Sequence, residues 1–175
     1  LVGTMGAEIY EISAGDGSNY HAGPVLQGHC RHEVHGLAMS PIKPEYCTVG
    51  DDQTVRIWDL KTRALIKMVM LDTMARTCRY SPDGALIVVG LGAKVEGVAR
   101  QKKMGAYIVL DSSDLTITHE ARDSKEPLTD IKFSGDGKTL AVATLDSSIY
   151  LYNVEDFTSK GRCKGHSGGV LHMDF

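Results

Sequence analysis

Three segments of the chain repeat one pattern, and this internal repeat limits the possible folds more than any other feature. Each segment pairs a short apolar run that ends in serine with a turn, in VHGLAMSPIKPEYCTVG, ARTCRYSPDGALIVVGL and LTDIKFSGDGKTLAVAT. The serines Ser40, Ser81 and Ser134 lie 41 and 53 residues apart, and a β-rich run follows each one: TVRIWD, AYIVLD and SIYLYN. A period of about 20 to 50 residues is typical of stacked or radial repeats.

The middle copy of the repeat carries an insertion. The distance from the serine to the next-to-last residue of the β-rich run is 18 residues in the first and third copies, to Trp58 and Tyr152, but 29 from Ser81 to Leu110. The additional residues correspond to GAKVEGVARQKK, at 92–103. We expect them to lie between the second and third strands of that unit.

The repeat positions alternate as strands do. Apolar residues occupy two positions, two residues apart, in all four copies: Leu37, Cys78, Ile131 and Met173, then Met39, Tyr80, Phe133 and Phe175. The residues between them are mostly polar, so one face of each strand is apolar. The first complete unit predicts strands at about 34–40, 45–50, 54–59 and 64–70, and no segment predicts an amphipathic helix. Four strands in about 40 residues is the size of a β-propeller blade.

The expected fold is therefore all-β: a partial propeller over 1–175. The expected blades are at about 1–27 (partial), 28–71, 72–121 and 122–164, with only a first strand at 165–175. Because a propeller hides its sheet edges by closing, the two ends are expected to complement each other as one split blade. Either two chains exchange these terminal strands in a homodimer, or neighbouring residues of a longer chain complete a seven-bladed ring.

Gly28-His29 and Trp58-Asp59 within one period resemble a WD repeat. The resemblance implies a structural hydrogen-bond tetrad of His29, Thr48, Asp52 and Trp58. A buried indole N–H and a buried carboxylate each need a partner, and imidazole and hydroxyl groups link the two. In the last complete blade Asp146 is retained, but Val142 and Tyr152 replace the hydroxyl and the indole, so we expect packing to hold that blade instead.

The segments VHGLAMSPIKPEYCTVGDDQTVRIWDL and LTDIKFSGDGKTLAVATLDSSIYLYNV, with CKGHSGGVLHMDF and the opening LVGTMGAEIYEI, are similar to the propeller region of echinoderm microtubule-associated protein-like (EML) proteins. The resemblance implies a cytoplasmic, cytoskeletal, non-enzymatic interaction platform that needs no cofactor and whose partner is tubulin or microtubules. A generic WD scaffold for signalling or ubiquitin-ligase adaptor complexes is the alternative.

Composition excludes several other classes. The formal charge of −3 does not favour nucleic acid or a membrane surface as a partner. The chain has neither an apolar stretch long enough to cross a membrane nor a signal peptide, so we expect no membrane association. Its four cysteines are scattered without a C-x-x-C pair, which favours free thiols in a reducing compartment.

Basic residues gather in the loops expected at one rim of the propeller. The insertion contributes Lys94, Arg100, Lys102 and Lys103, and neighbouring loops contribute Arg31, His32, Arg122 and Lys125. This candidate partner-binding rim is suited to acidic segments such as the tails of tubulin, through long-range attraction that salt weakens. The simpler interpretation, which we favour, is a solvated surface loop.

Three catalytic or ligand-binding patterns are weighed and set aside. Gly165-His166-Ser167-Gly168-Gly169 fits G-x-S-x-G, but a nucleophilic Ser167 needs a following helix and later acid and histidine partners, for which eight residues leave no room. A serine hydrolase is only a remote alternative. His29, His32 and His35 with Cys30 lack the spaced pairs of a zinc site, so no metal is expected. The N-terminal glycines match no nucleotide-binding motif.

Overall fold

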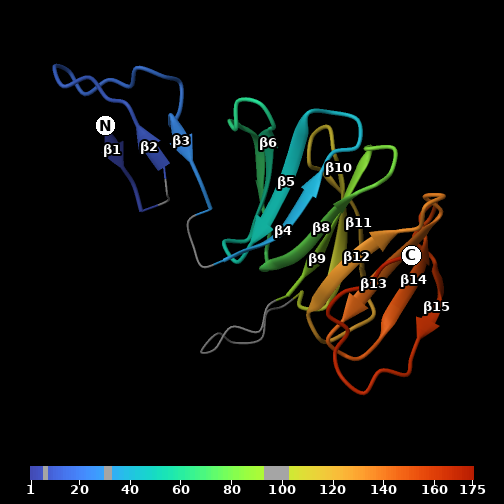
Figure 1. Ribbon diagram of the computed structural model, residues 1–175. Helices are drawn as coiled ribbons and strands as arrows, with labels where there is room; N and C mark the ends of the chain where they lie inside the picture. Colours follow the sequence, from blue (N-terminus) through green and yellow to red (C-terminus); the bar gives the residue numbers. More distant parts are fainter. Residues whose placement is uncertain (6–7, 30–32, 93–102) are drawn as a thin grey trace.

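The computed structural model describes residues 1–5, 8–29, 33–92 and 103–175, and all regular elements in these ranges are β-strands (Figure 1). Three antiparallel sheets of four strands each follow one another along the chain. A smaller three-stranded sheet precedes them, made of β1 (Val2–Gly3), β2 (Glu8–Tyr10) and β3 (Leu26–Gln27). The all-β prediction and the repeating four-stranded unit are both confirmed.

Each four-stranded sheet is a simple meander in chain order. The first contains β4 (Val34–Met39), β5 (Glu45–Gly50), β6 (Thr54–Asp59) and β7 (Leu65–Met70). The second contains β8 (Ala75–Tyr80), β9 (Leu86–Leu91), β10 (Ala106–Asp111) and β11 (Ile117–Arg122). The third contains β12 (Leu128–Phe133), β13 (Thr139–Thr144), β14 (Ile149–Asn153) and β15 (Ser159–Cys163).

The repeating serines close the turn between the first and second strands of their sheets. Ser81 Oγ donates to Asp83 Oδ1 at 2.5 Å and accepts the Leu86 N–H at 2.9 Å. Ser134 does the same with Asp136 and Thr139, at 2.6 and 2.9 Å. A glycine with φ near +70° follows each aspartate, at 84 and 137, a conformation that residues with a Cβ rarely adopt. The sequence period is thus a period of hairpin turns.

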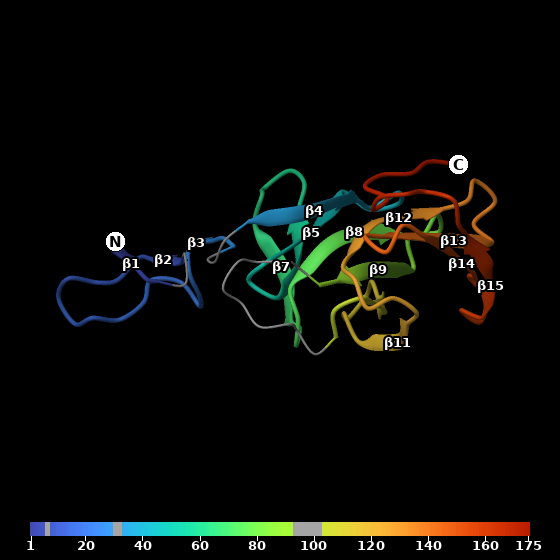
Figure 2. The ribbon, with the colours of Figure 1, turned by 90° about the horizontal axis from the view of Figure 1, so that it is seen from below.

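The four-stranded sheets pack face to face around their innermost strands (Figure 2). Strand β8 contacts both β4 and β12, and the sheets fan out from these strands toward β7, β11 and β15. Two apolar cores fill the interfaces between consecutive sheets. Gly36 allows the close approach of β4 to β8, because a Cβ there would lie 2.5 Å from Val49 Cγ2 and 3.0 Å from Cys78 N. This radial arrangement is that of a β-propeller whose ring is not closed.

The two apolar repeat positions in the first strand of each sheet are buried in one sheet and exposed in another. Cys78 and Tyr80 of β8 are buried against the preceding sheet. Their counterparts in β4, Leu37 and Met39, are 60% and 50% exposed. The sheet that precedes β4 is β1–β3, which stands apart from the main body in Figures 1 and 2. The first four-stranded sheet therefore leaves apolar side chains uncovered.

The strand expected at 165–175 does not form in the structure. The small sheet β1–β3, expected to complement it, lies at the opposite side of the molecule (Figure 1). The segment nevertheless lies beside β12. Val170 N donates to Thr144 O at 3.1 Å, and Thr129 Oγ1 donates to Val170 O at 2.6 Å. The segment thus lies where the first strand of a following sheet would lie, but it is not paired in a sheet.

Candidate functional site

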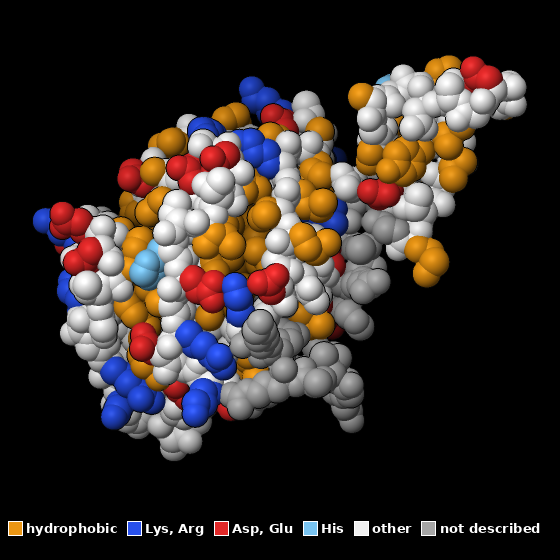
Figure 3. Space-filling view, turned by 180° about the vertical axis from the view of Figure 1, so that it is seen from behind, with side chains coloured by type: hydrophobic (Ala, Val, Ile, Leu, Met, Phe, Trp, Pro, Cys, Tyr) orange, Lys and Arg blue, Asp and Glu red, His pale blue; other side chains and the backbone are white. Residues whose placement is uncertain are grey.

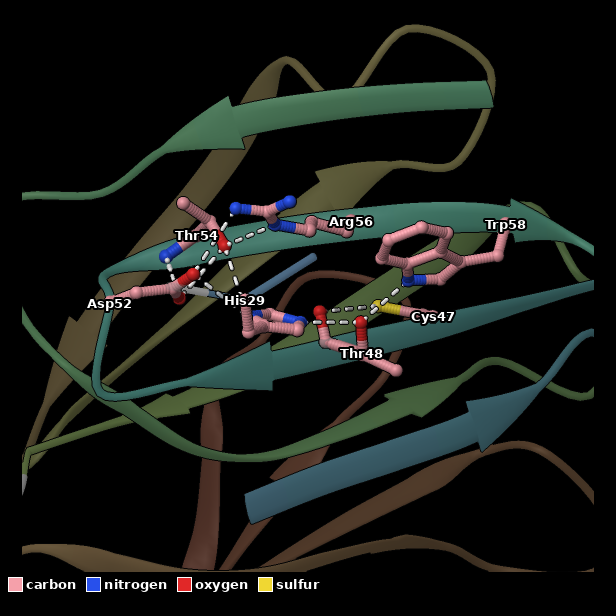
Figure 4. Close-up of polar contacts among 7 residues, drawn as sticks. All are labelled: His29, Cys47, Thr48, Asp52, Thr54, Arg56 and Trp58. Carbon is pink, nitrogen blue, oxygen red and sulfur yellow. Dashed lines mark hydrogen bonds and ion pairs between the residues drawn. The ribbon is translucent and has the colours of Figure 1, made fainter. Parts of the chain in front are cut away.

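A chain of hydrogen bonds joins the segment before β4 to strands β5 and β6 (Figure 4). His29 Nδ1 lies 2.9 Å from Asp52 Oδ2, and His29 Nε2 lies 2.7 Å from Thr48 Oγ1. The Trp58 indole donates to the same Thr48 oxygen at 2.7 Å. If Nδ1 carries the proton, each donor has one acceptor: indole to hydroxyl, hydroxyl to Nε2 and Nδ1 to carboxylate. The four residues named as a tetrad thus contact one another in sequence.

Two further residues surround the tetrad carboxylate. Thr54 Oγ1 donates to Asp52 Oδ1 at 2.8 Å, and Arg56 Nη2 lies 3.3 Å from Asp52 Oδ2. Residues 54, 56 and 58 alternate along β6 and so share one face of the sheet. The same alternation is visible in the sequence TVRIW, but the WD-repeat pattern drew attention to Trp58 alone in this run.

The electrostatics of Asp52 follow from these contacts. Burial favours the neutral acid, but hydrogen bonds from His29 and Thr54 outweigh it and lower the pKa of Asp52. The carboxylate is therefore ionised at neutral pH while almost fully buried. Its charge is matched by contacts with His29, Thr54 and Arg56, although Nη1 of Arg56 is itself buried without a hydrogen-bond partner among the described residues. The tetrad fixes one loop against two strands.

The third sheet contains a different polar network, which corrects the expectation that packing alone holds it. The Tyr150 hydroxyl donates to Asp146 Oδ2 at 2.7 Å, and the Tyr152 hydroxyl donates to Asp123 Oδ2. Tyrosine reaches farther than the indole N–H, so no hydroxyl is needed at Val142. Sequence reasoning missed this network because it looked for the same residue types, although both tyrosines stood in the SIYLYN run.

The tyrosines of the third sheet are held neutral. Burial, together with the hydrogen bond to Asp146, raises the pKa of Tyr150 to about 12. Burial and the contact with Asp123 also raise the pKa of Tyr152. The Arg162 guanidinium lies 4.9 Å from the centre of the Tyr150 ring, a cation–π contact. These side chains are positioned as hydrogen-bond donors, not as bases.

The second sheet has an apolar interior at the same positions. Val89 and Leu110, the counterparts of Thr48 and Trp58, are fully buried in the core. Three sheets of one repeat are therefore stabilised in three ways: by the tetrad, by packing and by tyrosine hydroxyls.

The basic residues expected at the rim fall into two groups. Arg31, His32, Lys94, Arg100 and Lys102 lie outside the described residues. Lys103 is engaged within the chain, with Nζ 2.8 Å from Glu120 Oε2 and 3.3 Å from Asp72 Oδ2. Arg122 Nε donates to Ser124 O at 3.4 Å.

Lys125 also has interactions within the chain. The insertion joins β9 to β10, the second and third strands of its sheet, as the repeat spacing predicted. Figure 3 shows Lys and Arg side chains along the lower edge of the face seen from behind.

The remaining sequence patterns do not assemble catalytic sites in the part of the chain that the structure describes. Ser167 is exposed, and no helix follows it before residue 175. The strand–turn–helix context of a nucleophile elbow is therefore absent there. No group of three His, Cys, Asp or Glu side chains is placed to hold a metal ion among the described residues. Cys30 and His32 lie outside them. No helix in the described ranges is long and apolar enough to span a membrane.

The part of the chain that holds the three four-stranded sheets matches known proteins. Residues 34–175 match the family model of the echinoderm microtubule-associated protein second beta-propeller. Echinoderm microtubule-associated protein-like 3 of Mus musculus is 33% identical over 156 residues, which is 87% of this chain and 16% of that protein. The 77 kDa echinoderm microtubule-associated protein of Strongylocentrotus purpuratus is 31% identical and covers 100% of this chain and 22% of its own length. The chain thus spans about a fifth of the relatives that it matches.

Proposed function

This chain belongs to the echinoderm microtubule-associated protein family, and on that premise we propose that it is a non-catalytic interaction module that binds microtubules or other cytoskeletal proteins in the cytoplasm. The observation that carries the proposal is the family match over 34–175, the part of the chain that holds all three four-stranded sheets. The named relatives are microtubule-associated proteins. A stack of sheets that presents loops at both ends suits binding rather than chemistry, since the tetrad and the tyrosine contacts join parts of the fold to one another.

The contact surface that we propose to test, against the simpler interpretation of solvated loops, is the loop rim, meaning the loops at 28–33, 92–105 and 122–127. Two of these loops lead into the first strand of a sheet, and the third joins a second strand to a third strand. Because neighbouring strands are antiparallel, the start of a first strand and the end of a second strand lie at the same end of the stack. Their basic residues favour an acidic partner surface. Lys103 contributes less free charge than the sequence implied, because Glu120 and Asp72 already pair with it. The tetrad supports the rim indirectly by fixing His29 beside its first loop.

Pull-down of purified tubulin by the 175-residue chain tests the proposal. Capture that weakens with added salt supports it. Failure to capture tubulin at tens of micromolar, while a different WD-binding adaptor protein is retained, would favour the generic scaffold instead.

A further inference from the structure

Four residues at one repeat position line a single pocket. His35, Arg76, Thr129 and Leu171 each lie two residues before the apolar column of Leu37, Cys78, Ile131 and Met173. The pocket has a volume of about 430 Å³, and its other walls are Pro127, Leu128, Leu145 and His172. Since β4, β8, β12 and the C-terminal segment all contribute, the pocket lies at the axis around which the sheets fan out.

Arg76 is the strongest charge in this axial pocket, and its partner is unusual. Its Nη1 atom lies 3.0 Å from Nδ1 and 2.8 Å from Nε2 of the same histidine, His35. Imidazole supplies no countercharge of the kind a carboxylate gives. Among the residues that the structure describes, no carboxylate lies within ion-pair distance of the Arg76 guanidinium. A half-buried guanidinium without a carboxylate retains unused hydrogen-bond donors.

The nearby acids are directed elsewhere. Asp51 Oδ1 lies 3.1 Å and Glu33 Oε2 lies 4.0 Å from His35 Nε2, so both carboxylates face the histidine. Asp51 Oδ1 is buried and has no hydrogen-bond partner among the described residues. Asp130 Oδ2 accepts the Met173 N–H at 3.2 Å, and its Oδ1 lies 3.9 Å from the Arg79 guanidinium. None of these carboxylates of the described residues lies within ion-pair distance of the Arg76 guanidinium.

From this arrangement we infer that the axial pocket binds a carboxylate side chain of an acidic peptide segment, with Arg76 as the residue that recognises it. A guanidinium offers two parallel N–H donors, which match the two oxygens of a carboxylate. The apolar walls formed by Leu128 and Leu145 reduce solvent screening on one side of the pocket and strengthen the pairing. The volume is at the lower end of the range for ligand pockets and fits one or two side chains.

The pocket favours a carboxylate over a phosphate group. A phosphate ester carries close to two charges and is usually held by several cations or by consecutive backbone N–H groups. No lysine is among the described residues that line the pocket, and the Thr129 hydroxyl already donates to Val170 O at 2.6 Å. One guanidinium matches one carboxylate in charge and in geometry.

This inference rests on the proposed function only in taking the chain as an interaction module. It concerns Arg76, which lies outside the loop rim, although Pro127 of the third rim loop lines the same pocket. A glutamate-rich peptide with a fluorescent label serves as the probe, and its binding to the 175-residue chain is measured by anisotropy. Arg76→Gln is expected to weaken binding by about 10- to 100-fold, the effect of losing a charge-assisted contact. Lys138→Gln removes the same charge from an exposed turn at the other end of the stack and should leave binding within about twofold.

A second variant guards against a folding defect in Arg76→Gln. Leu171→Glu places a carboxylate on an exposed segment at the pocket mouth, where it competes with the probe, and Leu171→Gln is its neutral control. We expect Leu171→Glu to lose binding of the labelled peptide and Leu171→Gln to keep it. Equal binding by wild type and both Arg76→Gln and Leu171→Glu would overturn the inference. So would displacement of the probe by millimolar inorganic phosphate but not by free glutamate-rich peptide. If tubulin is captured and the probe is not bound, only this inference fails; Arg76-dependent probe binding without tubulin capture refutes only the proposed function.

Discussion

Asp123 takes the place in the third four-stranded sheet that His29 takes in the first. Each lies eleven residues before the turn serine of its repeat, Ser134 and Ser40. His29 reaches the indole of Trp58 through Thr48, whereas Asp123 accepts the Tyr152 hydroxyl directly. One position in the repeat therefore connects the incoming loop to the third strand by two different chemistries.

Removal of the Thr48 hydroxyl should destabilise the fold. Thr48→Val keeps the shape but leaves the Trp58 N–H and His29 Nε2 without their shared partner, at a cost of about 1–3 kcal/mol in the free energy of unfolding. Urea unfolding followed by the fluorescence of Trp58, the single tryptophan, measures the change. Thr118→Val, whose hydroxyl donates to Val109 O at an exposed position of β11, is the matched control and should change stability by under about 0.5 kcal/mol. Equal effects of both changes would deny the tetrad its structural role.

The contact between Tyr152 and Asp123 should appear as an energetic coupling. Tyr152→Phe and Asp123→Ala are each expected to lower the free energy of unfolding, and the double variant should lose less than the sum. We expect a coupling of about 0.5–2 kcal/mol from a double-mutant cycle. Tyr20→Phe, at a residue that is 65% exposed, provides the control. Strict additivity would show that the Tyr152–Asp123 contact adds nothing to the stability of the third sheet.

The lowered pKa of Asp52 predicts how stability depends on pH. In the folded chain the pKa of Asp52 lies below the unfolded value of about 3.9, so its ionised form adds stability above that pH. The contribution disappears as pH falls through the folded pKa. Wild type should therefore exceed Asp52→Asn in stability at pH 7, and the gap should narrow below about pH 4. A gap that widens on acidification, measured by urea unfolding across this range, would contradict the assignment.

The uncovered face of β4 predicts self-association. Leu37 and Met39 are exposed, although their counterparts in β8 are covered by a neighbouring sheet. Light scattering at micromolar concentration should report a mass above the 19.0 kDa of one chain, because a second copy would cover this apolar face. Leu37→Lys should shift the chain toward monomer, whereas Ile117→Lys, on exposed β11, should not. A monomeric wild type would exclude this association and also the exchange of terminal strands.

Much of the fold was predictable from the repeats. The serine spacing located the hairpin turns, and the strands of the first sheet match their predicted ranges closely. The strand at 165–175 was not predictable in the same way, because a sequence column gives the side-chain pattern of a strand but not the presence of its pairing partner. The exposure of Leu37 was not predictable for the same reason, because the burial of a strand residue depends on whether a neighbouring sheet covers it.

The polar networks were predictable only where residue types repeat. His29 and Trp58 were identified because they match the residue types of a WD repeat. The Tyr152–Asp123 contact depends on the length of the tyrosine side chain, which a residue-by-residue comparison treats as a mismatch. The axial position of Arg76 required the three-dimensional arrangement, because residues 35, 76 and 129 approach one another only when the sheets fan around one axis.

Co-sedimentation with microtubules shows most directly whether this module binds the cytoskeleton through its loop rim. Wild type should pellet with microtubules at low salt and be progressively released as salt screens the rim charges. Lys102→Glu combined with Lys103→Glu should weaken pelleting at every salt concentration, whereas Lys138→Glu with Lys160→Glu, away from the rim, should not. Binding through the rim is contradicted if the wild-type chain stays in the supernatant at low salt, or if it pellets equally well after the rim charges are reversed.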